Sequence, residues 1–143
     1  MSRPGPRGRA AYRHFITIST RWADNDAYGH INNAIFYQWF DTAVNQWLIE
    51  EGLLDLGAGD PIGLVVETGS TYFSSLSYPG DVEVGIAIDQ LGSSSVTYRI
   101  GVFGAGSNEP SAQGHFTHVY VGRDSRRPSP LPNAWRSKLE TLT

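Results

Sequence analysis

The length and composition of the chain are those of one globular domain. Its 143 residues are 40% hydrophobic and 17% charged, which is enough to bury a sizeable core. A formal net charge of −3 argues against a basic binding face. The lack of cysteine excludes disulfides and thiolate metal ligands. We see no signal peptide and no apolar run of the roughly 18 residues that a membrane span needs, so we expect a cytoplasmic protein with no nucleic-acid or membrane partner.

The N-terminal segment, residues 1–11, is predicted to be a flexible, solvated arm, because prolines and glycines separate its arginines. A single domain is expected over residues 12–143, since the chain shows no internal repeat. In residues 12–22 apolar side chains alternate with polar ones, and several threonines are present. This pattern predicts a first strand.

Residues 34–51 are predicted to form one long helix. Their apolar side chains recur at spacings of three and four, no proline or glycine interrupts them, and Gly52 stands at the position of a C-terminal cap. Asn32 or Asn33 can serve as the N-cap. The polar residues form one narrow stripe, so we expect protein to surround this helix on most sides.

The remainder of the chain predicts an antiparallel sheet. Segments rich in β-branched and aromatic residues alternate with short turns of Gly, Pro, Ser or Asn, which favours hairpins over parallel crossovers. The predicted strands are residues 62–73, 81–91, 94–103 and 112–122. Since one helix cannot cover both sides of a curved sheet, we expect an α+β fold in which the sheet wraps around the helix.

Residues 24–33 (DNDAYGHINN) place two carboxylates, one imidazole and three amides between the first strand and the helix. A calcium loop is excluded, because Tyr28 and Ile35 occupy positions that need oxygen ligands. Zinc would lack ligands, since His115 and His118 are oddly spaced on a strand and point to opposite faces. We therefore expect no metal. An ordinary turn followed by a helix cap would explain the residue types alone.

Three features of this stretch favour catalysis over a simple connection. The polar run is longer than a turn needs, and it contains His30. Asp26 precedes the most apolar helix of the chain, whose unpaired N-terminal N–H groups suit an oxyanion. Apolar helix residues such as Phe36 lower the local dielectric. A carboxylate beside oxyanion donors at an apolar slot is suited to acyl transfer.

A family resemblance lies in the same residues. Residues 20–33, followed by the pair at 36–37, resemble the motif of the hot-dog-fold acyl-CoA thioesterases, in the branch of 4-hydroxybenzoyl-CoA thioesterase. Residues 72–81 and 127–132 show weaker likenesses, so that most of residues 12–135 is covered. The resemblance implies a hot-dog fold, in which an antiparallel curved sheet of five or six strands wraps around one long central helix.

The resemblance also implies an assembly and a reaction. Such domains form homodimers whose sheets join, and often homotetramers, with active sites at the dimer interface. The expected reaction is the hydrolysis of an acyl-CoA thioester to the free acid and coenzyme A. No cofactor is expected beyond the coenzyme A of the substrate.

The roles of single residues are carried over by position. Asp26 matches the catalytic carboxylate of the branch, either as nucleophile or as general base, and the oxyanion donor corresponds to the backbone N–H of Asn33 or a close neighbour. His30 fills a motif position to which we assign a structural or orienting role, and Asp24 is expected to brace the loop. The candidates for binding the CoA phosphates are Arg123, Arg126 and Arg127, although a solvated tail would explain these residues equally well.

Other functions of the same fold remain as alternatives. Hot-dog hydratases place an Asp and a His with four residues between them, whereas Asp26 and His30 have three, so a 3-hydroxyacyl-thioester hydratase is a minor alternative. The His-Gly-Gly turn of the other thioesterase branch is missing. A non-catalytic module that binds acyl thioesters is the main alternative. The acyl group, and coenzyme A versus a carrier protein as its carrier, stay open.

Overall fold

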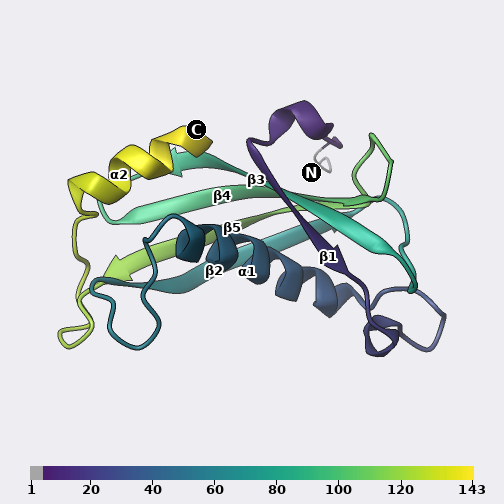
Figure 1. The fold of residues 1–143 in the computed structure, drawn as a ribbon, viewed down its shortest axis with the longest axis horizontal. Coiled ribbons are helices and arrows are strands. Elements are labelled where there is room, and N and C mark those ends of the chain that lie inside the picture. The colour runs from purple at the N-terminus through teal and green to yellow at the C-terminus, as the bar shows by residue number, and fades with distance from the viewer. Residues whose placement is uncertain (1–4) are drawn as a thin grey trace.

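The sheet and the central helix form the expected α+β arrangement. The structure, a computed structural model, describes residues 5–143. Five antiparallel strands lie in the order β1-β3-β4-β5-β2 and curve around α1 (Figure 1). The bounds are β1 His14–Ser19, α1 Asn33–Glu50, β2 Ile62–Tyr72, β3 Asp81–Leu91, β4 Ser95–Gly104, β5 Ala112–Val121 and α2 Asn133–Leu139. This confirms the hot-dog fold with five strands.

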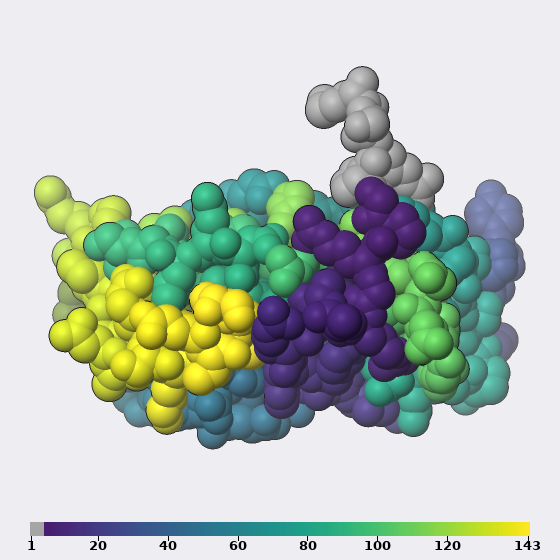
Figure 2. Space-filling model, turned by 90° about the horizontal axis from the view of Figure 1, so that it is seen from above, coloured from purple at the N-terminus to yellow at the C-terminus, as the bar shows by residue number. Residues whose placement is uncertain are grey.

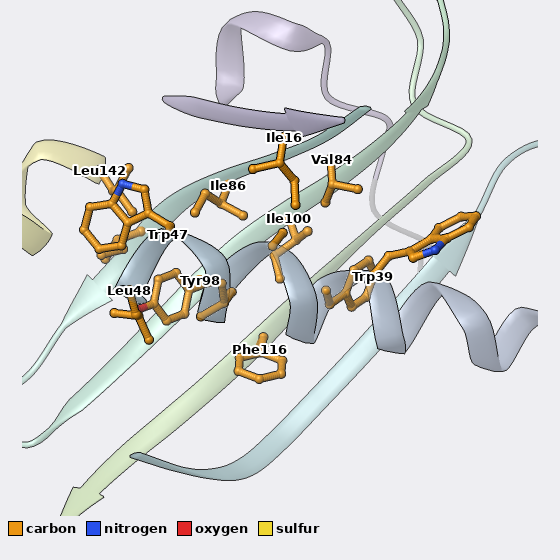
Figure 3. Packing of buried hydrophobic residues seen from close by; sticks show 14 of the residues in the cluster. Ile16, Trp39, Trp47, Leu48, Val84, Ile86, Tyr98, Ile100, Phe116 and Leu142 are labelled. Atoms are coloured by element: carbon orange, nitrogen blue, oxygen red, sulfur yellow. The ribbon is translucent and has the colours of Figure 1, made fainter. Parts of the chain in front are cut away.

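Helix α1 supplies the centre of the core, as its wide apolar face predicts. Phe40, Ala43 and Val44 are fully buried, and they belong to one cluster with side chains from the concave face of the sheet. Figure 3 shows Trp47 and Leu48 of α1 close to Tyr98 of β4, and all three belong to this cluster. Burial of this apolar area is the main source of stability for the fold.

The N-terminal segment differs from the loose arm that we expected over residues 1–11, of which the first four lie outside the described residues. The backbone N–H of Arg7 donates to Gln113 Oε1 at 2.9 Å, and Gln113 Nε2 donates to the Gly5 carbonyl at 2.8 Å. Arg9 forms an ion pair with Glu83 at 2.9 Å. Residues 5–11 are therefore fixed against the convex face of the sheet, next to the C-terminal segment (Figure 2).

The anchor of this segment is Tyr12, whose ring lies over two glycines of the sheet. A Cβ atom at Gly85 would lie 2.9 Å from Tyr12 Cβ, and one at Gly101 would lie 2.5 Å from the Tyr12 hydroxyl. Only glycine at these two positions leaves room for the ring. Tyr12 is 5% exposed and clusters with Ala87 and Phe103, and burial raises the pKa of its hydroxyl to about 12.

The two edges of the sheet are unlike. At one edge β1 pairs with only part of β3, and the short 3₁₀ helix Glu140–Leu142 that follows α2, with its buried Leu142, packs against β3. At the other edge β2 pairs with β5 alone. The three consecutive apolar residues Leu64, Val65 and Val66 are 37%, 49% and 58% exposed. An unpaired apolar strand edge of this kind is a template for pairing with another chain.

His118 makes the stability of the fold depend on pH. It is 4% exposed among aromatic rings of the core, and burial lowers its pKa from 6.5 to about 4. The unfolded chain therefore binds a proton that the folded chain excludes. The free energy of unfolding therefore does not depend on the titration of His118 well above pH 6.5, and it decreases as the pH falls from 6.5 towards 4.

We expect the free energy of unfolding to fall by about 2 kcal/mol through His118 between pH 7 and pH 5. Urea unfolding at both pH values and one protein concentration measures it. The His118→Phe variant, which keeps a ring but cannot titrate, should lose about that much of the pH dependence. An equal pH dependence in the variant and the wild type would contradict the assignment.

Candidate active site

The polar loop before α1 is braced by a buried carboxylate. Asp24, which is 1% exposed, accepts hydrogen bonds from the Arg21 guanidinium at 2.7 and 3.0 Å and from the Arg21 backbone N–H at 2.8 Å. These bonds raise the pKa of Arg21 above its ordinary value. The Asp24 carbonyl accepts from the Asn32 N–H at 2.8 Å. Asp24 thus has the bracing position that we expected, and its oxygens are committed to the loop.

Asp26 differs from Asp24, because only one of its two carboxylate oxygens accepts hydrogen bonds within residues 5–143. Its Oδ1 accepts from the backbone N–H of Tyr28 at 2.8 Å and of His30 at 3.3 Å. Its own N–H donates to the His30 carbonyl at 2.7 Å. The tight turn needs Gly29, which has a φ of 78°. Across residues 5–143, no hydrogen bond is made to Oδ2, so this oxygen is available to a water molecule or a carbonyl carbon.

The first turn of α1 presents a backbone donor close by. Asn32 is the N-cap, and its Oδ1 accepts from the Ala34 N–H at 2.9 Å. The N–H of Asn33, the first helical residue, has no acceptor in the described part of the chain. The helix dipole adds positive potential at this point. An N–H with these properties is suited to stabilising an oxyanion.

The connection between β2 and β3 holds the loop from the other side. The Ile31 N–H donates to the Leu76 carbonyl at 2.7 Å, and the Ser77 hydroxyl donates to the Gly29 carbonyl at 2.9 Å. The Tyr78 N–H donates to Asn25 Oδ1 at 3.1 Å. The weak family likeness at residues 72–81 was the one signal in the sequence that marked this segment.

A pocket of about 220 Å³ lies between the loop, the start of α1 and this connection. It is smaller than the roughly 300–1,000 Å³ of most small-molecule sites. The pocket brings together the three predicted residues Asp26, His30 and Asn33. Its other lining residues are Ile31, Phe36, Tyr72, Ser74, Ser75 and Leu76. His30 contributes backbone bonds to Asp26, as described above, while its exposed ring forms no hydrogen bond within residues 5–143.

The three arginines that we predicted to bind CoA phosphates are not near this pocket in the same chain. They follow β5, where Val121 pairs with Ile62 at the start of β2, whereas the pocket lies at Tyr72, the end of β2. The 11 residues of β2 span about 35 Å. Arg123 Nε donates to the Gly59 carbonyl at 2.7 Å. The guanidinium groups of Arg126 and Arg127 have no partner among residues 5–143.

A larger cavity, of about 390 Å³, lies on the opposite, convex face between the N-terminal segment and β4, β5 and β2. Its charged groups already have partners. Arg99 is paired with Asp89 and also donates to the Ala11 carbonyl at 2.7 Å. His115 contacts Glu67 at 2.6 Å. We therefore take the smaller pocket as the candidate active site, since a carboxylate oxygen and a backbone N–H there both have no hydrogen bond within residues 5–143. The described residues contain no group of three potential metal ligands and no helix that is long and apolar enough to cross a membrane.

Comparison with known proteins identifies the family. The model of the thioesterase-like superfamily matches residues 20–139. The structure is similar to that of the PA5185 protein from Pseudomonas aeruginosa strain PAO1, with 46% sequence identity over 97% of each chain and a TM-score of 0.94. No curated protein matches the chain significantly.

Two solved thioesterases share the fold at lower identity. A 1,4-dihydroxy-2-naphthoyl-CoA thioesterase from Synechocystis is 22% identical over 90% of this chain and 96% of that chain, with a TM-score of 0.81. A gentisyl-coenzyme A thioesterase is 21% identical over 88% of this chain and 99% of that chain, with a TM-score of 0.78. With a family match that spans most of its length and with the fold in place, the chain belongs to the thioesterase-like superfamily of hot-dog proteins.

Proposed function

We propose that this protein hydrolyses acyl-CoA thioesters to the free acid and coenzyme A. Membership of the thioesterase-like superfamily points to thioester hydrolysis. The observation that carries the assignment to this site is the pairing of an uncommitted Asp26 Oδ2 with an uncommitted Asn33 N–H in one pocket. A reactive carboxylate and an oxyanion donor are the two groups that attack on a thioester carbonyl requires.

Two routes use this geometry. In both, the thioester carbonyl oxygen accepts from the Asn33 N–H, which stabilises the negative charge of the tetrahedral intermediate. In the first route Asp26 removes a proton from water, the hydroxide attacks the carbonyl carbon, and the proton passes to the departing thiolate. In the second Asp26 attacks directly, an acyl–aspartyl anhydride forms as the thiolate leaves, and water then hydrolyses the anhydride.

We further propose that the active unit is a homodimer formed by the open edge of β2, alone or within a homotetramer. The exposed Leu64, Val65 and Val66 support this proposal, because an open strand edge with exposed apolar side chains is a template for pairing with another chain. A two-fold axis through the middle of β2 makes the two strands antiparallel. The end of one β2 at Tyr72 then lies beside the start of the other at Ile62.

This pairing gives the distant arginines a role. Because Arg123, Arg126 and Arg127 follow the partner of Ile62 in β5, the two-fold axis carries them from about 35 Å away to the neighbourhood of the other subunit's pocket. There, the guanidinium groups of Arg126 and Arg127, which have no partner among residues 5–143, are suited to binding the phosphates of coenzyme A.

The double substitution Arg126→Ala/Arg127→Ala is expected to raise KM for acyl-CoA by about tenfold and to leave kcat within about twofold. The effect should weaken as salt is added, because exposed charges are screened. Steady-state kinetics at two ionic strengths measures it. The control is Arg13→Ala, which removes an exposed guanidinium that donates to the carbonyl of the last residue, Thr143. This substitution should change neither constant. A KM that does not respond to the double substitution would remove these residues from the site.

The proposed function is tested with a panel of acyl-CoAs and one acyl carrier protein thioester in the presence of a thiol reagent. Release of free thiol over many turnovers supports hydrolysis, and the rates across the panel give the acyl and carrier preference. Tight binding without release would support the alternative of a binding module, and loss of water from a 3-hydroxyacyl-CoA with the thioester intact would support a hydratase.

A further inference from the structure

We propose that Tyr72 is a positioning residue that holds the first turn of α1 so that the Asn33 N–H points into the pocket. The inference rests on the proposed function, since it concerns the oxyanion donor of that reaction. Tyr72 is the last residue of β2 and lies 39 positions from Asn33 in the sequence, yet its hydroxyl donates to the Asn33 carbonyl at 3.0 Å.

The peptide group between Asn33 and Ala34 is held from both sides. Its carbonyl accepts from the Tyr72 hydroxyl at 3.0 Å, and its N–H donates to Asn32 Oδ1 at 2.9 Å. A peptide group is planar, so two bonds on opposite sides fix its orientation. The carbonyl has two lone pairs, so the bond from Tyr72 is compatible with the helical bond that this carbonyl also accepts.

Fixing this peptide group also fixes its neighbour. The proposed oxyanion donor is the N–H of the preceding peptide group, which joins Asn32 to Asn33 and shares the Asn33 Cα atom. Only two backbone dihedral angles separate the two planes. An N–H at the end of a helix would otherwise take part in the fraying of the first turn. Removal of the Tyr72 bond therefore leaves the donor in place but lets its direction vary.

Tyr72 itself is held firmly enough to act in this way. Its backbone pairs with Ala112 in the sheet, and its ring packs edge-to-face on Phe36, with 5.2 Å between ring centroids. Burial raises the pKa of its hydroxyl, so the group stays protonated at neutral pH and can donate. The bond thus ties the helix N-terminus to the rigid sheet rather than to another loop.

The effect should fall on the chemical step and not on substrate binding. A donor aimed at the oxyanion stabilises the transition state more than the bound ester, and removing one such donor from an enzyme typically costs about 10²–10³ in kcat. A misoriented donor should cause a smaller decrease in kcat than a missing one. We expect the Tyr72→Phe variant, which keeps the ring and its packing, to show a kcat lower by about tenfold with KM within about twofold of the wild type.

The matched control is Tyr78→Phe, which removes a hydroxyl from the same β2–β3 region. The ring of Tyr78 packs on Trp22, and its hydroxyl forms no hydrogen bond with residues 5–143, so both kinetic constants should stay unchanged. Thermal unfolding of both variants shows whether the fold is retained. If Tyr72 had only a structural role, the Tyr72→Phe substitution would lower the melting temperature and the fraction of active protein. It would leave both kcat per active site and KM unchanged.

Three results overturn the inference while leaving the proposed function in place: a kcat for Tyr72→Phe within twofold of the wild type, an effect confined to KM, or an equal effect in Tyr78→Phe. Titration of active sites with a slowly hydrolysed acyl-CoA normalises kcat for any misfolded fraction. If the wild type itself releases no thiol from any acyl-CoA, the proposed function fails first, and this inference fails with it.

Discussion

Replacement of Asp26 by asparagine is expected to lower kcat for acyl-CoA hydrolysis by about 10²–10⁴-fold or more. Asparagine has the same shape, and its side-chain oxygen can still accept from the Tyr28 and His30 N–H groups that hold Asp26 Oδ1. The fold and the loop should therefore remain. What is lost is the free carboxylate oxygen, which the reaction needs either to attack the carbonyl or to accept a proton from water.

The control for this variant is Asp41→Asn, which makes the same chemical change on the exposed side of α1, where Asp41 accepts from Asn45. Thiol release at saturating substrate, with circular dichroism to verify the fold, measures both variants. Asp41→Asn should keep wild-type activity. If the Asp26→Asn variant folds and retains more than about a tenth of the wild-type kcat, Asp26 is neither the nucleophile nor the base.

The Val66→Lys substitution is expected to separate the proposed dimer and to lower kcat/KM for acyl-CoA by about tenfold, as loss of the arginines does. Val66 lies at a β-bulge of the open edge and is 58% exposed. In a two-fold pair its two copies approach each other, and two like charges at the centre of an interface cost several kcal/mol. The dissociation constant should rise by about 100-fold or more. The monomer should then bind acyl-CoA poorly, because the partner's arginines are missing.

Analytical ultracentrifugation and thiol release over a range of protein concentrations measure this effect together. The control is Leu56→Lys, which places the same charge on an apolar residue that is 76% exposed but lies outside the strand. It should leave both mass and activity unchanged. A Val66→Lys protein that stays dimeric would place the interface elsewhere, and a fully active monomer would show that one chain holds a complete site.

Local patterns were enough to predict most of the fold. The spacing of apolar residues gave the helix to within one residue at each end, since α1 runs over Asn33–Glu50, and the short turns gave antiparallel pairing. The Asn32 cap followed from residue type. The first strand is shorter than expected, β1 being His14–Ser19, because Trp22–Asp24 forms a 3₁₀ turn that the Arg21–Asp24 contact closes.

The N-terminal segment shows where local patterns failed. Its prolines and glycines predicted a loose arm, but residues 5–11 are fixed because Tyr12 fits over Gly85 and Gly101. Those glycines lie more than 70 positions away and look like ordinary interruptions of a strand. A complementarity that forms only when distant residues meet in space leaves no periodic signal.

The candidate site also contains both residues that a sequence motif could indicate and residues that meet only in the folded chain. Asp26, Asn33 and His30 lie in one loop, so a motif could indicate them together, and the pocket holds all three. Tyr72 and the clamp through Ser77 come from the end of a strand and from a turn, and their contacts with the loop are visible only in three dimensions. The arginines after β5 were candidates through the family resemblance, and they lie at the opposite end of β2 from the pocket of the same chain.

Hydrolysis at Asp26 is tested most directly by the time course of thiol release when the wild-type protein is mixed with an excess of acyl-CoA. We expect continued release over many turnovers, with the free acid formed in equal amount, and release of both products at least about 10²-fold slower in the Asp26→Asn reaction. Acyl-CoA that binds to the protein but releases no thiol, or release that the two proteins share equally, would contradict hydrolysis at Asp26.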